Sequence, residues 1–238
     1  MRLNNHELYD FFVEKRILAL YHANTVGTSI TYLQNGGLLS RGAVESKGLF
    51  QTPQPKSDYK DKQVNVWNDV FLDTADLHTA FSRENYYGPI LFELDRELIK
   101  DENFEIWITK NNPMYWDVNS TMEERYFQNV DELKKLWHTI DRQRKMITIR
   151  NNDSPILFNY VRKVFVDDPQ HSIKIDNEDV ILFNSAKNEI IKNLPDNHIL
   201  KGKFIPRPDC VKWCKCRKDY KADYNVEDLK RLFINSKI

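Results

Sequence analysis

The chain has 238 residues, of which 41% are hydrophobic and 29% are charged, and its 35 basic residues are balanced by 35 acidic ones. This composition excludes a disordered, collagenous or coiled-coil protein, and the charge balance excludes steering of nucleic acid by the molecule as a whole. No apolar run reaches the roughly 18 residues that a membrane span needs, and the start lacks the apolar centre of a signal peptide. We therefore expect a cytoplasmic protein with one main core and no membrane segment.

The first quarter of the chain predicts a helix, a strand and a second helix. Residues 3–18 have apolar residues at helical spacing, and residues 18–22 form a short apolar run that is typical of a strand. A helix that begins at Thr28 or Ser29 is expected to end at the glycine pair 36–37, since glycine adopts the left-handed terminal conformation at little cost. Residues 40–63 are rich in Gly, Pro, Ser and Lys, and predict a long loop without regular structure.

The rest of the chain mixes strands and helices. Strands are predicted within 64–78, 89–94, 104–109, 146–149, 160–166 and 179–183. Helices are predicted over 126–137 and 186–194, and from Asn225 onward. Because strands and helices do not alternate regularly, the sequence favours an α+β fold, a mixed sheet with covering helices, over a doubly wound parallel sheet. We expect a main domain over residues 1–195 and a basic, cysteine-containing segment over residues 196–238.

Glycines gather in one part of the chain. Five of the seven glycines lie between positions 27 and 48. Glycine has no Cβ, so a cluster of this kind lets the backbone approach a ligand such as a nucleotide. The alternative is that these glycines end a helix and form turns. The sequence contains neither a G-x-G-x-x-G pattern nor a P-loop lysine motif, so neither a Rossmann nor a Walker site is predicted.

Polar groups interrupt two apolar stretches. His22 ends the first predicted strand, where one ring nitrogen is suited to binding a sugar hydroxyl while the backbone holds the other; a purely structural histidine is the alternative. Asp69, Asp73, Asp76 and His78 follow within ten positions and fit acid/base chemistry or a hard metal ion, unless they are turn formers and helix caps. Asp76 and His78 are two positions apart on a predicted strand, and therefore share a face.

All three cysteines lie close together near the C-terminus. Cys210, Cys214 and Cys216 form a C-x3-C-x-C pattern that can wrap a zinc ion if a fourth ligand, such as His198, completes the site. Three reduced thiols are the alternative, in keeping with a reducing compartment.

The same region is basic. Residues 199–221 contain eight Lys or Arg against two Asp, with Phe204, Trp213 and Tyr220 between them. Cationic residues interleaved with aromatic ones suit single-stranded nucleic acid, whose phosphates bind the cations and whose bases stack on the rings. A solvated surface around a small zinc knuckle is the alternative.

The run from residue 21 to residue 39 resembles the opening of the DarT-type ADP-ribosyltransferases, NAD-consuming toxins that modify nucleic acid. That family begins with Tyr-His-Ile-Thr, a helix and Gly-x-Leu-Leu, and this chain has Tyr21-His22-Ala23-Asn24 and later Gly36-Gly37-Leu38-Leu39. Asn24 thus replaces the threonine of the family. The resemblance extends over residues 18–185 and leaves the cysteine-containing tail unmatched.

The resemblance implies a set of NAD contacts. They are His22, Asn24, Gly36, Gly37, Arg41 and Phe71. Phe71 would line the nicotinamide side, and Arg41 would pair with the pyrophosphate, because a guanidinium matches phosphate oxygens in a bidentate way.

One position departs from the family in a way that affects the chemistry. The family places a catalytic glutamate just before a late strand, and Met146 stands there in this chain. The candidates for a replacement carboxylate are Asp73, Asp76 and Glu45, and Asp76 with His78 is the preferred pair. Otherwise the chain uses another mechanism or binds a nucleotide without turning it over.

The sequence therefore predicts an enzyme that transfers ADP-ribose from NAD to single-stranded DNA or RNA, as a toxin or antiphage effector with an antitoxin partner. Arg144, close to the position of the missing glutamate, would hold a phosphate of the acceptor. The alternative is a noncatalytic, zinc-stabilised protein that binds single-stranded nucleic acid through residues 210–221.

Overall fold

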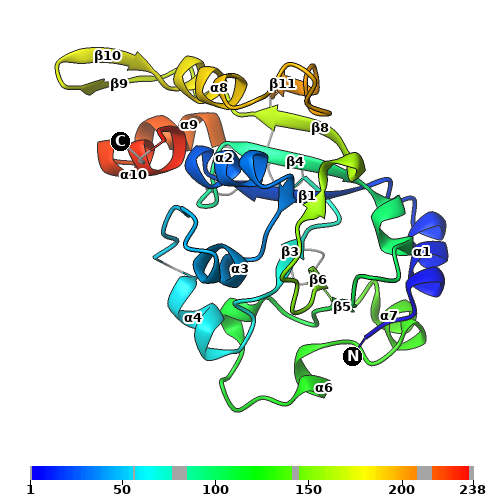
Figure 1. Cartoon of the computed structure of the whole chain (residues 1–238). Coiled ribbons are helices and arrows are strands. Elements are labelled where there is room, and N and C mark those ends of the chain that lie inside the picture. Colours follow the sequence, from blue (N-terminus) through cyan, green and yellow to red (C-terminus); the bar gives the residue numbers. More distant parts are fainter. Residues whose placement is uncertain (1, 56, 77–84, 141–144, 208–215, 236–238) are drawn as a thin grey trace.

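Two β-sheets form the centre of the computed structural model, which describes residues 2–55, 57–76, 85–140, 145–207 and 216–235 (Figure 1). The larger sheet has four strands in the order β1 (Ala19–Asn24), β4 (Ile90–Asp95), β8 (Val161–Val166) and β11 (Phe204–Pro206). The strand pairs β1–β4 and β4–β8 are antiparallel, whereas β8–β11 is parallel.

The second sheet continues from the edge of the first. It contains β3 (Val70–Leu72), β6 (Ile147–Ile149) and β5 (Ile106–Ile108), all antiparallel. Tyr21 of β1 and Asp73 after β3 join the two sheets by exchanging two backbone hydrogen bonds of 2.9 Å. Two small sheets pair β2 (Gly37–Leu38) with β7 (Ile156–Leu157), and β9 (Ser172–Ile175) with β10 (Glu178–Ile181).

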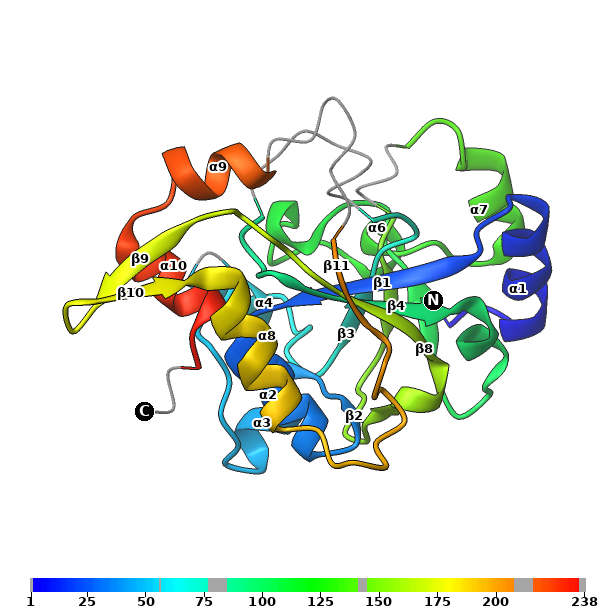
Figure 2. The same ribbon diagram turned by 90° about the horizontal axis from the view of Figure 1, so that it is seen from above.

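Helices cover the sheets at both ends, as Figure 2 shows. They are α1 (Asn5–Glu14), α2 (Val26–Gln34), α3 (Arg41–Ser46), α4 (Asp58–Gln63), α6 (Met122–Arg125), α7 (Val130–Leu136), α8 (Leu182–Lys192), α9 (Cys216–Ala222) and α10 (Val226–Phe233). Short 3₁₀ helices are η1 (Arg96–Lys100), η2 (Pro113–Tyr115) and η4 (Phe158–Tyr160). Helices α1 and α7 pack together, while α2, α8 and α10 pack together at the other end.

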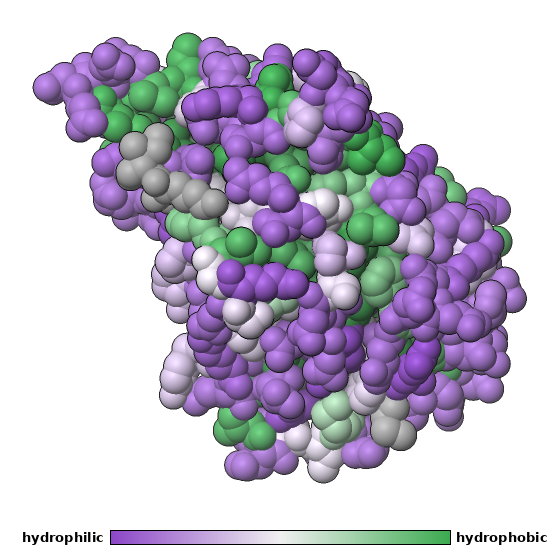
Figure 3. Space-filling view, viewed as in Figure 1, coloured by the Kyte–Doolittle hydropathy of each residue, from purple (hydrophilic) through white to green (hydrophobic). Residues whose placement is uncertain are grey.

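One apolar core includes residues from both sheets and from the last helix. Leu229, Leu232 and Phe233 of α10 are buried in the same cluster as the strands of both sheets. Hydrophilic residues cover most of the face seen in Figure 3, with hydrophobic residues in small groups between them. Among the described residues, none of the helices has the length and apolar character to cross a membrane.

The α+β class predicted from the sequence is confirmed. The last helix begins as predicted, since Asn225 Oδ1 accepts a hydrogen bond of 2.8 Å from the Asp228 amide. The second helix begins earlier than predicted, because Thr25 caps it by accepting from the Thr28 amide at 3.3 Å.

The prediction of a structureless loop over residues 40–63 was wrong. Both α3 and α4 lie there, and Ser40 caps α3 by accepting a hydrogen bond of 3.1 Å from the Ala43 amide. Each of these helices has only 6 residues, which is too short to show helical periodicity in the sequence. The strand predicted within 64–78 is shorter than expected: only β3, Val70–Leu72, forms there, because the chain turns before Val70.

Candidate active site

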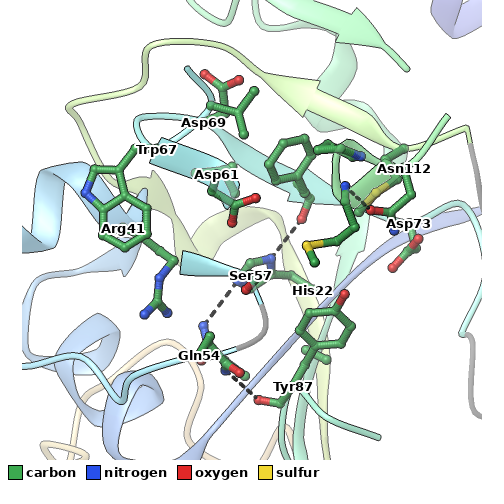
Figure 4. Close-up of a pocket in the computed structure, with 18 of the residues that line it drawn as sticks. His22, Arg41, Gln54, Ser57, Asp61, Trp67, Asp69, Asp73, Tyr87 and Asn112 are labelled. Carbon is green, nitrogen blue, oxygen red and sulfur yellow. Dashed lines mark hydrogen bonds between the residues drawn. The ribbon is translucent and has the colours of Figure 1, made fainter. Parts of the chain in front are cut away.

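A cavity of about 1030 Å³, measured out to its open mouth, lies between the C-terminal part of β1, the segment with α3 and α4, strand β3 and η2 (Figure 4). This volume includes open solvent at the mouth of the cavity. Among the polar side chains that line it are His22, Asn24, Arg41, Asp61 and Asp73. The first and last of these residues, His22 and Asp73, are 51 positions apart in the sequence, and the fold brings them to one cavity.

His22 enters the cavity as a neutral imidazole. Its Nδ1 lies 2.9 Å from the backbone oxygen of Phe71. A carbonyl oxygen only accepts hydrogen bonds, so Nδ1 carries the proton and donates it. Burial lowers the pKa of His22, and the charge of Arg41 lowers it as well, against the opposing effect of the Phe71 hydrogen bond. Nε2 is therefore an acceptor near pH 7.

Asn24 supports this arrangement from the end of β1. Its amide nitrogen donates to the Tyr32 hydroxyl at 3.0 Å, and its Oδ1 accepts from the Thr25 amide at 2.9 Å. The same nitrogen lies 3.4 Å from Nε2 of His22, a long contact that leaves the imidazole nitrogen available for a shorter bond to a hydroxyl. The 2.9 Å bond from Nδ1 to the Phe71 oxygen holds the ring, and Asn24 lies beside it from a buried position.

Arg41, the first residue of α3, lines the cavity with a guanidinium that the protein only partly engages. Its Nη2 donates to the backbone oxygen of Thr52 at 3.1 Å and to Asp58 Oδ2 at 2.9 Å. Its guanidinium carbon lies 5.2 Å from the centre of the Trp67 ring. In the part of the chain that the structure describes, its buried Nε has no hydrogen-bond partner. A buried donor without a partner is rare, and this one is suited to an anionic ligand.

Two carboxyls that line the cavity have raised pKa values for the same principal reason. Burial raises the pKa of Asp61 to about 7; Arg41 opposes this, and Asp58 and Asp69 add to it. Burial also raises the pKa of Asp69 to about 6, although Arg150 and the Asn151 amide act against the rise.

The hydrogen bonds of these two carboxyls differ. Within the described residues the Asp61 carboxyl accepts no hydrogen bond, and in Figure 4 it points toward the middle of the group of lining side chains. Asp69 is held by Arg150, whose Nε is 3.3 Å away, and by the Asn151 amide at 3.0 Å. Asp69 therefore anchors the chain after β6, whereas Asp61 faces the cavity.

The structure brings several residues predicted from the sequence to this cavity. His22, Asn24, Arg41 and Phe71 all line it, and so does Met146, at the position where the resemblance places a glutamate. Of the carboxylates considered as replacements, Asp73 lines the cavity, whereas Asp76 and Glu45 do not.

The two glycines are placed elsewhere. Gly36 has φ +78° and ends α2, and neither it nor Gly37 is among the residues that line the cavity. A Cβ on Gly37 would lie 2.2 Å from the backbone oxygen of Ile156, so its missing side chain permits the pairing of β2 with β7. Contact of these glycines with NAD stays a prediction.

Asp76 belongs to a buried ion-pair cluster instead. Arg207 forms ion pairs with both Asp76 and Asp167, and Asp167 also accepts hydrogen bonds from Asn85 at 3.1 Å and from the Tyr220 hydroxyl at 2.8 Å. Burial opposes the charge of Arg207, but the two carboxylates outweigh it and raise its pKa. Asp76 thus acts as a structural partner in the described chain.

Other predicted residues lie apart from the cavity or outside the described residues. His78 and Arg144 lie outside them, so their predicted roles are not tested. Glu45 accepts hydrogen bonds from Lys62 at 2.8 Å and from Trp67 Nε1 at 2.7 Å, on the outer side of the cavity wall.

The zinc prediction also falls largely outside the described residues. Cys210 and Cys214 are not among them, and only the backbone of Cys216, at the start of α9, is described. His198 accepts a hydrogen bond of 3.2 Å from the Leu200 amide. Within the described ranges, His, Cys, Asp and Glu residues do not gather as a metal site.

Part of the basic and aromatic run has a structural role. Arg207 is 6% exposed within its ion pairs, and Tyr220 is 1% exposed within the core. Because both are buried, they are not available for phosphates or bases, and the predicted nucleic-acid surface over 199–221 is corrected at these two positions.

Sequence reasoning missed Asp61 and Trp67. Asp61 lies in a stretch of alternating charges that reads as a solvated loop, and no local pattern marks it as facing a cavity. Trp67 was assigned only to a predicted strand. Its interaction with Arg41 depends on how α3 folds back onto the turn after α4.

Comparison with known proteins supports the fold. No family model and no curated protein matches the sequence. A solved structure described as Thermus sp. 2.9 DarT in complex with ADP-ribosylated ssDNA is similar, with a TM-score of 0.52 and 10% identity over 81% of this chain and 95% of that chain. At that identity the similarity concerns the fold alone. The chain therefore has an α+β fold similar to that of this DarT structure.

Proposed function

We propose that this protein transfers ADP-ribose from NAD to a single-stranded nucleic acid. The proposal depends chiefly on one observation: a DarT-like fold holds a neutral His22 with an acceptor Nε2 in the same cavity as an Arg41 with an unpartnered Nε. A sugar hydroxyl fits the first group, and a phosphate oxygen fits the second. NAD carries both kinds of group, ribose hydroxyls and phosphates, and His22 and Arg41 line one cavity.

The chemistry of the transfer follows from the substrate. NAD is bound with a ribose hydroxyl donating to His22 Nε2 and a phosphate oxygen accepting from Arg41 Nε. The bond between ribose C1′ and the nicotinamide nitrogen breaks, and its electron pair stays on that nitrogen and neutralises the pyridinium. A nucleophile of the nucleic acid then forms the new bond to C1′ and gives up its proton. Positive charge develops on the ribose, so a carboxylate beside it accelerates the step.

Two exposed aromatic side chains support a single-stranded acceptor. Tyr59 of α4 is 73% exposed and Tyr115 of η2 is 75% exposed. These two elements contact each other, and both contribute residues to the cavity. Unpaired bases stack on exposed aromatic rings without regard to sequence, whereas paired bases do not offer their faces. A single strand that stacks on either ring would lie on an element that also contributes residues to the cavity.

The direct test is release of nicotinamide from NAD in the presence of single-stranded DNA or RNA, with mass spectrometry of the oligonucleotide. We expect release together with an ADP-ribose adduct on one polymer. His22→Ala should lower the rate by about 100-fold, the range for loss of a positioned polar group in an active site. His6→Ala is the matched control, because His6 is an exposed residue of α1. If neither polymer is modified and no nicotinamide is released, the proposal is wrong.

We extend the proposal to a toxic activity that a partner protein neutralises. ADP-ribose on DNA or RNA adds bulk and charge to the template, which would stop replication or translation. Expression of the chain in growing bacteria should therefore arrest growth, and expression of the His22→Ala variant should not. Equal growth at equal protein levels would contradict the toxic role and leave the transfer reaction itself to the nicotinamide assay.

A further inference from the structure

The transfer needs a carboxylate, and the residue at the expected position is Met146, which lines the cavity with a thioether. A thioether neither stabilises a cation through charge nor accepts a proton near neutral pH. The described residues that line the cavity include three carboxyls, those of Asp61, Asp69 and Asp73. They differ in the hydrogen bonds and ion pairs that they already form with the rest of the protein.

Asp69 is committed to structure. Its side chain is 1% exposed, and it forms an ion pair of 3.3 Å with Arg150 and accepts from the Asn151 amide at 3.0 Å. A group held in this way has little freedom to face a substrate. In Figure 4 it also lies at the edge of the group of lining side chains.

Asp73 is fixed at the joint between the two sheets. Its amide and its carbonyl are both paired with Tyr21, at 2.9 Å each. Figure 4 places Asp73 beside Asn112, on the side of the cavity away from Arg41 and Trp67. In that view Asp73 lies across the cavity from the guanidinium that would hold the phosphates of NAD.

Asp61 has the position and the freedom that the step requires. It follows Ser57 by one helical turn of α4, with its amide donating to the Ser57 oxygen at 2.8 Å, so the helix backbone fixes where its side chain begins. Figure 4 shows its carboxyl pointing to the middle of the cavity, between Arg41 and Trp67 on one side and Ser57 and His22 on the other. Within the described residues it accepts no hydrogen bond.

The geometry points to Asp61 as the carboxylate of the ADP-ribose transfer, a role given to it from α4 in place of the glutamate that Met146 displaces. This inference rests on the proposed function.

The step balances as follows. As the C1′–nitrogen bond breaks, its electron pair leaves with nicotinamide, and the Asp61 carboxylate faces the cationic ribose. The lone pair of the acceptor atom forms the bond to C1′. The proton that this atom loses goes to Asp61, which releases it to water. The products are nicotinamide, the ADP-ribosylated nucleic acid and one proton.

The protonation state of Asp61 suits both of its proposed roles, which are to stabilise the cationic ribose and to accept the proton of the acceptor atom. Burial raises its pKa to about 7, so the carboxyl is a base of moderate strength near neutral pH. The charged groups that face it are Arg41, which favours the ionised form, and Asp58 and Asp69, which disfavour it. The cationic nicotinamide ring of bound NAD adds a positive charge, and therefore favours the ionised form further.

The test is Asp61→Asn, which keeps the shape and removes the charge. We expect nicotinamide release, with the polymer that wild type modifies, to fall at least 100-fold in kcat, while KM for NAD changes less than threefold. Asp58→Asn provides the contrast: because Asp58 holds Arg41 at 2.9 Å, its loss should raise KM for NAD more than it lowers kcat. Asp10→Asn, an exposed change on α1, is the matched control and should leave both constants unchanged.

The pH dependence of the rate distinguishes a chemical role of Asp61 from a structural one, because loss of a structural contact would not remove a titration step. Wild type should show a rise in kcat/KM for NAD with a midpoint near the pKa of Asp61 in the free protein, and Asp61→Asn should lose this step in its residual rate. Thermal unfolding of each variant separates loss of chemistry from loss of fold. If Asp61→Asn keeps the wild-type kcat, the assignment is wrong while the proposed function stands. If the wild-type chain itself releases no nicotinamide, both are wrong.

Discussion

Asp61 and Asp76 are both partly buried, but within the described residues one region leaves the carboxyl without a hydrogen bond and the other pairs it with a cation. Asp76 is paired with Arg207, and Asp167 binds the same guanidinium. Asp61 faces a cavity with no hydrogen bond from the described residues and a pKa raised to about 7. The first arrangement stabilises the fold and has no freedom for chemistry. The second costs stability when the carboxyl is ionised, which is typical of a functional site.

The two regions also differ in what they connect. The cluster around Arg207 joins the ends of β4, β8 and β11: the Asp167 amide donates to the Pro89 oxygen at 2.9 Å, and the Arg207 amide donates to the Val166 oxygen at 2.8 Å. The cavity wall around Asp61 is made from two short helices and turns. The first region thus joins the ends of strands, whereas the second is built from short helices and turns.

The largest expected effect comes from removing the cation of the cluster. Arg207→Met leaves Asp76 and Asp167 buried without their counter-ion, and we expect a loss of about 3–5 kcal/mol in the free energy of unfolding. Urea denaturation measures it. Lys201→Met is the control, since its pair with Asp196 is exposed and its loss should change stability little. A cost for Arg207→Met no larger than that of the control would contradict the structural role of the cluster.

The next effect concerns pH and separates the two aspartates in function. Asp61 must be ionised to act, and its pKa is about 7. The rate of nicotinamide release should therefore fall about tenfold per pH unit below 7 and level off above it, as expected when one group must lose a proton. Stopped assays from pH 5 to pH 9 test this. A flat profile across pH 6 to pH 8 would show that Asp61 does not limit the reaction.

A smaller effect is expected from returning a glutamate to the position of Met146. Met146 lines the same cavity as Asp61. In the Asp61→Asn background, Met146→Glu should therefore recover about tenfold in rate. General base catalysis contributes roughly 100-fold or more when the base is well placed. We expect a smaller gain here because the new carboxylate would enter the cavity from the residue before β6 and not from α4. Met146→Gln in the same background is the control for size. Equal rates for the two double variants would show that a carboxylate at this position does not reach the reacting ribose.

The smallest effect is on stability and has the opposite sign to the effect on activity. The pKa of Asp61 is raised from 3.8 to about 7, so the folded chain binds an extra proton between these values and loses that stabilisation as the pH rises through 7. Asp61→Asn should therefore be more stable than wild type at pH 8, by on the order of 1 kcal/mol, and should lose this advantage near pH 4. Thermal unfolding at both pH values measures the difference. A destabilised variant at pH 8 would mean that Asp61 has a structural partner.

The parts of the site that sequence predicted are those with a local signature. His22 was found from its position at the end of a short apolar run, whereas Asn24 was implied only by the family resemblance; both lie on β1. The ion pair of Asp76 was not predicted because its partner, Arg207, is 131 positions away, and a local pattern does not show such a pairing. Asp61 was missed because a helix of 6 residues leaves too few positions for a periodic pattern.

The bridge between Tyr21 and Asp73 gives the cavity an internal reporter. At this residue pair each amide donates to the carbonyl of the other across the junction of the two sheets, and both residues line the cavity. The rate of hydrogen–deuterium exchange at these two amides therefore measures how often the hydrogen bonds between the two sheets open. A molecule that contacts both sheets at once would slow the exchange of both amides together, so NMR follows occupancy of the cavity without any catalytic turnover.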